Sequence, residues 1–138
     1  MNLYFVAGLL LPPIVVIIMQ LAVMRSHREF LAAIPELRSA QDMYAFKRLA
    51  ATNMYLALVV IVLEVLLWGV WIVGVATRNL PLISIVLTFI PSVALLVIAL
   101  QAKQLEQRIQ TMPAADPALA AERDRVVDVW LHRPFPNW

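Results

Sequence analysis

Three long apolar segments dominate the pattern of hydrophobic and polar positions, and they cover residues 4–24, 54–77 and 80–101. A run of about 20 apolar residues matches a hydrocarbon core about 30 Å thick, because a helix rises about 1.5 Å per residue and satisfies its own backbone hydrogen bonds. Within these segments the only charged residue is Glu64. The pattern therefore predicts an all-α integral membrane protein with three transmembrane helices.

Helical signals continue beyond the apolar segments. Residues 26–29 read Ser-His-Arg-Glu, a capping-box pattern that predicts a short separate helix ending before Pro35. Residues 36–51 and 101–111 contain no Gly or Pro. We therefore expect Pro35 to open a cytoplasmic extension of the second span, and the third span to continue to about residue 111.

Proline lies inside two of the three spans. Pro12 and Pro13 fall in the first span, and Pro91 falls in the third. Because proline lacks a backbone N–H and its ring clashes with the carbonyl four residues earlier, we expect helix kinks at these positions. The freed carbonyls need partners in lipid, so the first span is expected to lean on other protein.

The segment after Pro113 is typical of an amphipathic helix. Asp116 suits the N-cap and Pro117 the first helical position, which predicts a helix to about His132, followed by an extended tail. The apolar side chains that we expect to dock on a partner or on the membrane are Leu119, Val126, Trp130, Phe135 and Trp138.

Basic residues are distributed unevenly around the spans. Five of the 11 Lys and Arg residues lie in the loop 25–53, whereas the turn between the second and third spans contains only Arg78. Lys- and Arg-rich loops stay on the cytoplasmic side. Contact with anionic lipid headgroups is enough to explain their positive charge, so we expect no nucleic-acid partner. We predict a plasma (inner) membrane protein with its N-terminus outside. A three-span membrane domain, residues 1–112, precedes a cytoplasmic arm, residues 113–138.

Composition excludes several classes of protein. Charged residues make up 14% of the 138 residues, whereas soluble domains contain about 25%. Disulfides and thiolate metal sites are excluded because the chain has no cysteine. Both histidines lie outside the spans, so no intramembrane imidazole is present to ligate haem. Met1 and Asn2 supply no basic n-region, so we expect the first apolar segment to be a retained span rather than a signal peptide.

Glu64 is the first candidate for chemistry. An ionised carboxylate near the middle of a span costs about 2.5–3.5 kcal/mol on insertion scales. Ser84, Thr88 and Ser92 recur every four residues on the third span and predict a hydroxyl stripe, with Ser92 near the depth of Glu64. One interpretation makes Glu64 a proton or cation site. We prefer the other, in which protonated Glu64 hydrogen-bonds a hydroxyl, a freed carbonyl or another subunit, because a proton path needs more titratable groups.

Two tryptophans share a helical face with this carboxylate. Trp68 and Trp71 follow Glu64 by four and seven residues, and the Trp68 indole is a potential donor to it. We interpret the pair as a helix contact, with lipid or pigment contact as the alternative. Gly69 and Gly74 are five residues apart, so they do not form the GxxxG spacing of close helix pairs.

The sequence leaves three functional hypotheses. We prefer a non-catalytic accessory or structural subunit of a larger membrane protein complex, hetero-oligomeric rather than homo-oligomeric, because the arm has a mixed-charge face that suits protein better than anionic lipid. The alternative is a small homo-oligomeric ion or proton conductor that uses Glu64. A membrane enzyme is the weakest hypothesis, since no nucleophile elbow, phosphate loop or catalytic carboxylate pair is present. We expect no metal and no cofactor apart from bound lipid.

Overall fold

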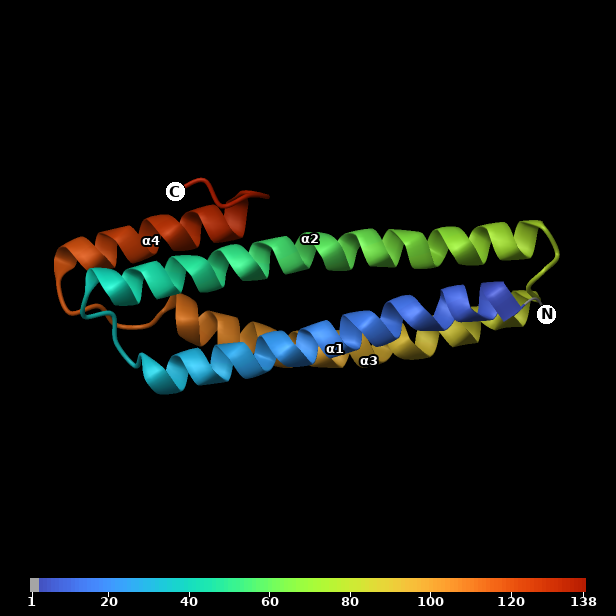
Figure 1. Cartoon of the computed structure of the whole chain (residues 1–138), viewed down its shortest axis with the longest axis horizontal. Coiled ribbons are helices and arrows are strands. Elements are labelled where there is room, and N and C mark those ends of the chain that lie inside the picture. Colours follow the sequence, from blue (N-terminus) through green and yellow to red (C-terminus); the bar gives the residue numbers. More distant parts are fainter. Residues whose placement is uncertain (1–2) are drawn as a thin grey trace. The chain divides into compact units, whose positions relative to one another are not determined.

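The computed structural model describes residues 3–138, which are all-helical and contain no β-strand. Met1 and Asn2, on which the expectation about the missing n-region rests, lie outside the described residues. The helices, labelled in Figure 1, are α1 (Leu3–Ala33), α2 (Ala40–Ala76), the short 3₁₀ helix η1 (Leu82–Ser84), α3 (Ile85–Gln110) and α4 (Pro117–His132).

Three of these helical segments are long and apolar enough to cross a membrane. They are Val6–Ala33, Ala40–Ala76 and Leu82–Gln110, which confirms the three predicted apolar helices. In the most apolar part of α2, 6% of the residues are buried within the chain. Such extensive exposed aliphatic surface is unfavourable in water, and it is expected where hydrocarbon surrounds a helix.

The first connection differs from the prediction. Residues 26–29 do not start a new helix, because α1 runs without interruption through them to Ala33. A Ser-x-x-Glu pattern caps a helix only where free backbone N–H groups exist, and inside α1 the preceding turn already occupies them. The prediction that this helix ends before Pro35 is confirmed.

The start of α2 lies five residues beyond the predicted Pro35. Ser39 and Asp42 form the capping box there. The Ser39 Oγ accepts a hydrogen bond from the Asp42 N–H at 3.2 Å, and the Asp42 carboxylate accepts one from the Ser39 N–H at 3.1 Å. Both free donors at the helix start are thus satisfied reciprocally.

A tertiary contact explains why the segment just after Pro35 is not helical. The Leu37 N–H donates to the Pro113 carbonyl at 2.9 Å, and the Ala115 N–H donates to the Leu37 carbonyl at 2.8 Å. These bonds form an isolated parallel bridge between Leu37 and Ala114. The bridge holds two connecting segments together, and sequence periodicity gives no sign of it.

Helices α1 and α3 continue through their internal prolines. Pro12 and Pro13 lie within α1, and Pro91 lies within α3. Hydrocarbon favours an uninterrupted hydrogen-bonded backbone, which accounts for helices that extend past these residues. The predicted kinks remain predictions.

The chain forms two compact units. Unit 1 contains Met1–Leu21 and Val59–Gln101, and unit 2 contains Ala22–Leu58 and Ala102–Trp138. The arm that we predicted as a separate segment therefore belongs, in unit 2, with the polar ends of the three long helices.

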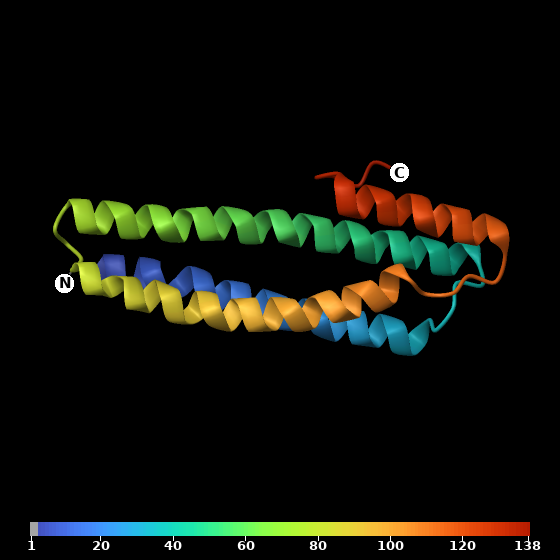
Figure 2. The same cartoon turned by 180° about the vertical axis from the view of Figure 1, so that it is seen from behind.

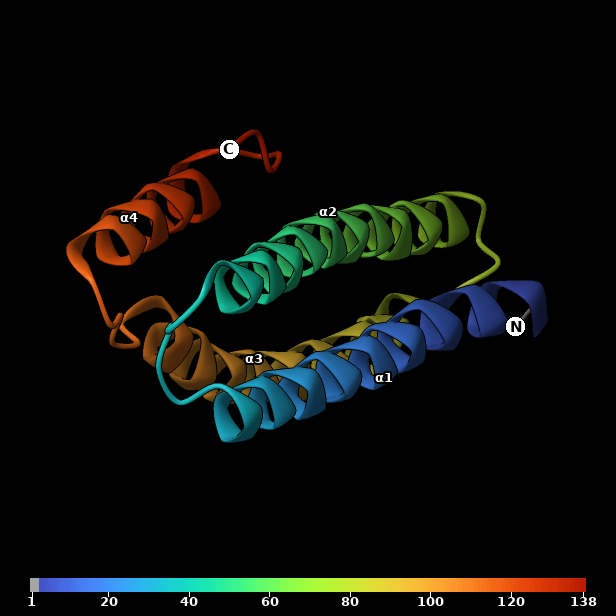
Figure 3. The same ribbon diagram turned by 60° about the vertical axis from the view of Figure 1, so that its left-hand side comes forward.

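Unit 1 has a small core in which α1 and α2 approach closely. Leu9, Leu67 and Leu80 are buried, and Trp71 is among the side chains packed against them. A Cβ added to Gly8 would lie 3.0 Å from the Val70 Cγ1 atom, so only glycine fits this contact without a shift. Figure 3 shows α1 and α3 side by side in this unit.

Unit 2 is built like a small soluble bundle. Its buried core draws on the connecting segments as well as on α2, α3 and α4, and its members are Leu37, Met43, Phe46, Ala50, Ile109, Met112 and Val126. Figures 1 and 2 show α4 beside the first part of α2. An ion pair between Lys47 and Glu122 joins these two helices, and Asn53 donates to Glu106 of α3 at 2.6 Å.

The predicted limits of the last helix are confirmed. The Asp116 carboxylate accepts a hydrogen bond from the Leu119 N–H at 2.8 Å, Pro117 is the first helical residue, and α4 ends at His132. The third long helix also ends as expected, with α3 closing at Gln110 before Pro113.

We expect Phe46→Ala to lower the free energy of unfolding of unit 2 by about 3–5 kcal/mol, because the fully buried ring leaves a cavity. Tyr44→Ala is the matched control, since Tyr44 lies two residues away on α2 and is 69% exposed. The stability of α4 in the two variants is measured by hydrogen exchange of its backbone amides in detergent micelles. Equal exchange in the two variants would show that Phe46 does not hold α4 in place.

Candidate polar site among the apolar helices

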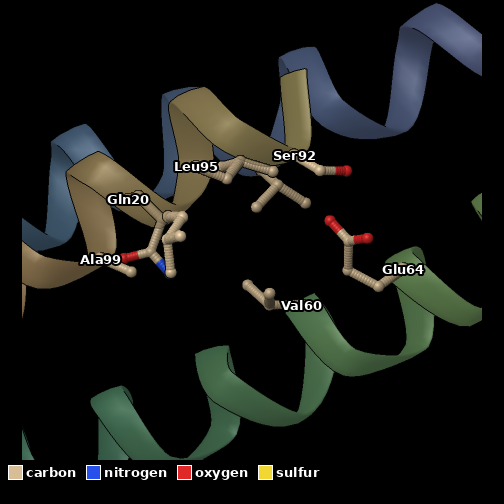
Figure 4. A pocket seen from close by; sticks show the side chains of 8 residues that line it. Gln20, Val60, Glu64, Ser92, Leu95 and Ala99 are labelled. Atoms are coloured by element: carbon tan, nitrogen blue, oxygen red, sulfur yellow. The ribbon is translucent and has the colours of Figure 1, made fainter. Parts of the chain in front are cut away.

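A pocket of about 240 Å³ lies between α1, α2 and α3 in unit 1 (Figure 4). One polar side chain comes from each helix: Gln20 from α1, Glu64 from α2 and Ser92 from α3. The apolar remainder of the lining consists of Val16, Val60, Leu95, Leu96 and Ala99. Polar groups from all three helices thus line one pocket in the part of the chain that is otherwise most apolar.

The Glu64 carboxylate has no protein partner in the described part of the chain. Its side chain is half-buried, and within residues 3–138 it makes neither a hydrogen bond nor an ion pair. Figure 4 shows the carboxylate pointing from α2 toward α3, on the side of Ser92. A polar group without a partner is costly in a hydrocarbon environment, so a bound group or a partner protein is expected to satisfy it.

Of the three hydroxyls predicted as a stripe, Thr88 and Ser92 lie on α3 and direct their protons at the helix itself, whereas Ser84 lies in η1 and its buried Oγ has no hydrogen-bond partner in the described residues. Ser92 donates to the Thr88 carbonyl at 2.8 Å, and Thr88 donates to the Ile85 carbonyl at 2.7 Å. Ser84 and Thr88 are buried away from the pocket, and only Ser92 of the three lines it. Ser92 therefore offers the pocket its oxygen lone pairs rather than its proton.

The two tryptophans contact one another rather than the carboxylate. The rings of Trp68 and Trp71 pack edge to face with centroids 6.1 Å apart, and no hydrogen bond joins Trp68 to Glu64 in the described residues. The Trp71 indole Nε1 is buried without an acceptor in that part of the chain. This arrangement agrees with a packing role for the pair.

Gln20 is a site residue that sequence reasoning missed. It is the only side-chain amide in the apolar segment 4–24, which was the available signal, but it carries no charge and belongs to no four-residue repeat of the kind that marked Ser84, Thr88 and Ser92. Gln20 lies one helical turn before the end of that segment. The pocket lining therefore extends from the middle of the second span to the end of the first.

The residues that we expected to dock on a partner lie in unit 2, and most of them contact the chain itself. Val126 is fully buried in the core of this unit. The side chains packed against that core include Leu119, Trp130 and Trp138. Phe135 differs from the other four, since it is 57% exposed.

The chemistry that the pocket offers is limited to one carboxylate and two neutral polar groups. No other Asp, Glu, Lys, Arg or His lines it. Within the described residues, no group of three or more His, Cys, Asp or Glu side chains is placed to hold a metal ion. The arrangement suits the binding of a hydrogen-bond donor, whereas an acid–base pair would need a second titratable group.

Comparison with protein-family models, curated proteins and solved structures finds no match for this chain. Functional inference therefore rests on the geometry of the two units.

We expect Glu64→Leu to leave the thermal stability of the purified protein unchanged or raised, because the carboxylate has no partner to lose and leucine at a helix centre is favourable by about 0.3–0.6 kcal/mol on insertion scales. Gly8→Leu should lower the melting temperature, since even a Cβ atom there crowds Val70. The melting temperatures of the two variants and of wild type are measured by tryptophan fluorescence during heating in detergent. A clear loss of stability in Glu64→Leu would instead indicate that protonated Glu64 fixes the helix register.

Proposed function

We propose that the protein is a non-catalytic accessory or structural subunit of a larger membrane protein complex, and that α2 packs against a helix of a partner. The observation that supports this proposal is the environment of Gly69, which is exposed near the end of α2. Apart from the adjacent residues and the local backbone of α2, no atom of the described chain lies within 4 Å of the position that a Cβ would occupy at Gly69.

Gly8 and Gly69, two of the three helical glycines of unit 1, differ in their surroundings. Gly8 permits the close approach of α1 to Val70, so its lack of a side chain is explained inside the chain. Gly69 has no such neighbour. Glycine costs a helix about 1 kcal/mol relative to alanine, and in membranes small residues allow two helix backbones to approach closely. A notch for an external helix accounts for this cost.

The notch lies at the centre of a continuous apolar face. The side chains three, four and seven residues from Gly69 on this face are more than half exposed, and they include Val62, Val65, Leu66, Ile72 and Val73. Hydrocarbon chains are as apolar as these residues, so helix association depends on close packing rather than on hydrophobicity. A glycine flanked by branched side chains provides a surface shaped for such packing.

Unit 2 supports a protein partner over a purely lipid one. The charges of α4 are mixed and partly paired, as in the Lys47–Glu122 and Arg123–Asp124 ion pairs. A helix that binds anionic lipid carries a Lys- and Arg-rich face instead. The apolar stripe of α4 is used within unit 2, so the docking role of the arm in this proposal falls to exposed side chains such as Leu131 and Phe135.

The proposal includes an orientation in the plasma (inner) membrane, with the N-terminus outside and the C-terminal arm in the cytoplasm. Arg28, Arg48, Lys103 and Arg108 are exposed, and all belong to unit 2. The turn 77–81 in unit 1 carries only Arg78. The positive-inside rule therefore favours a cytoplasmic unit 2.

Gly69→Leu should abolish association with the partner, because the new side chain fills the notch while its Cβ enters open space on the surface of α2. The matched control is Val97→Leu, which enlarges an exposed side chain on α3. The measurement is quantitative cross-linking and mass spectrometry after mild-detergent purification from native membranes, with unchanged melting temperatures as the folding check. Retention of the same partners by Gly69→Leu would contradict the proposal.

The pocket supports a second candidate, a small homo-oligomeric ion or proton conductor. Its polar groups run from Glu64 in the middle of α2 to Gln20 near the end of the first apolar segment. We expect Glu64→Gln to eliminate any proton or cation flux into proteoliposomes, because the substitution keeps the shape and removes the charge. Flux in wild type no greater than in protein-free vesicles, or equal flux in Glu64→Gln, would reject this candidate.

A further inference from the structure

We propose that the pocket formed by Gln20, Glu64 and Ser92 binds the protonated primary amine of an amphiphilic ligand. The ammonium group lies at Glu64, and the apolar part of the ligand lies against the aliphatic lining. This inference goes beyond the role as a subunit, because it assigns an occupant to a site within the chain itself.

The hydrogen-bonding capacity of the pocket determines the chemistry of its occupant. An ionised Glu64 only accepts hydrogen bonds. Ser92 has already directed its proton to the Thr88 carbonyl, so it too presents an acceptor to the pocket. The Gln20 amide lies at the other end of the pocket from Glu64 and Ser92 (Figure 4), where it faces the rest of the ligand. A primary ammonium group carries three N–H donors and no acceptor, which matches the two carboxylate oxygens of Glu64 and the Ser92 oxygen in number and in charge.

The shape of the pocket determines the rest of the ligand. Its volume of about 240 Å³ is slightly smaller than the roughly 300–1,000 Å³ typical of drug-sized ligands. Five of the eight lining residues are aliphatic. Apolar walls beside one charged end favour a short alkylamine, or an amine headgroup with the start of its lipid chain, over a polar solute.

An inorganic cation fits this lining less well. Calcium takes about 6–8 oxygen ligands and magnesium requires a near-octahedral set of six. The side chains of Gln20, Glu64 and Ser92 supply four oxygen atoms in all. A cation held there would need several waters against Val60, Leu95 and the other aliphatic residues, which provide no hydrogen bonds to them.

No other charge on the lining competes for the carboxylate. The described residues place no Lys, Arg or His side chain in the pocket. Trp68 and Trp71, which share a helical face with Glu64, do not donate to it in the described residues. An external ammonium group is therefore the partner that satisfies Glu64 without any rearrangement of the three helices.

The test uses the purified full-length protein in a nonionic detergent and amine-free buffer at neutral pH, with n-hexylammonium as the probe. We expect saturable binding by titration calorimetry and a saturable rise in melting temperature. Hexanol has the same chain and no charge, and hexyltrimethylammonium has the charge but no N–H donor. Both should bind at least about tenfold more weakly, since hydrogen bonds to charged groups contribute most of the affinity.

Matched variants separate this proposal from simple apolar binding. Glu64→Gln should weaken hexylammonium binding at least about tenfold, and Ser92→Ala should weaken it severalfold. Ser84→Ala, in the preceding 3₁₀ helix η1 and outside the pocket, should bind as wild type does. Equal binding by Glu64→Gln, or equal binding of hexanol and hexylammonium to wild type, would overturn the proposal. Hexylammonium binding is measured on the purified protein without a partner. Its outcome is therefore independent of the Gly69→Leu experiment, which measures association with a partner protein.

The amine has two possible sources, and nanodiscs distinguish them. If the natural occupant is an ethanolamine headgroup, nanodiscs of phosphatidylethanolamine should weaken hexylammonium binding to wild type relative to phosphatidylcholine nanodiscs with the same acyl chains. Equal affinity in the two lipids would assign the site to a free amphiphilic amine. Loss of hexylammonium binding in Glu64→Gln establishes that the pocket binds ammonium. The nanodisc comparison then identifies the source of the amine.

Discussion

A backbone N–H or carbonyl in hydrocarbon finds no water, so each peptide group must be paired within the protein. In α1, α2 and α3 the pairing is achieved by helices that continue well past their apolar segments and, in α1 and α3, past internal prolines. The same constraint gives Glu64 its importance. In water an unpaired carboxylate is ordinary, whereas among apolar helices it requires a partner that the described chain does not provide.

The interactions that stabilise the interior of unit 2 differ from those that stabilise the interior of unit 1. Unit 2 has a core of fully buried side chains such as Phe46 and Ile109, together with ion pairs and a capping box, as in a soluble bundle. Unit 1 buries few side chains and depends instead on a glycine contact, inward-facing hydroxyls and the backbone itself. This contrast is expected where one unit excludes water by burial and the other lies in an apolar solvent.

Sequence patterns predicted the features that depend on local chemistry. The apolar length, the Asp116 cap, Pro117 and the end of α3 before Pro113 are properties of short segments, and the structure agrees with each. The start of α2 was predicted incorrectly because Leu37 is held by a bridge to a distant segment. No local pattern reports a contact between residues so far apart in the chain.

The candidate site was predictable only in part. Glu64 and Ser92 were identified from charge and from four-residue spacing, whereas Gln20 was missed because an uncharged amide stands out less in an apolar segment. The direction of the Ser92 hydroxyl depends on the helical backbone around Thr88. That direction decides which hydrogen bonds remain for a ligand, and it becomes visible only in three dimensions.

The bridge between Leu37 and Ala114 also has a consequence for biosynthesis. Leu37 and Phe46 are synthesised long before Met112 and Val126, which belong to the same core. Until these later residues emerge from the ribosome, the first half of unit 2 has an unfilled apolar surface, a state in which nascent chains are prone to aggregate. The segment that carries Met112 and Val126 closes this surface only after it has emerged, so folding of unit 2 waits for residues that are made far later than Leu37.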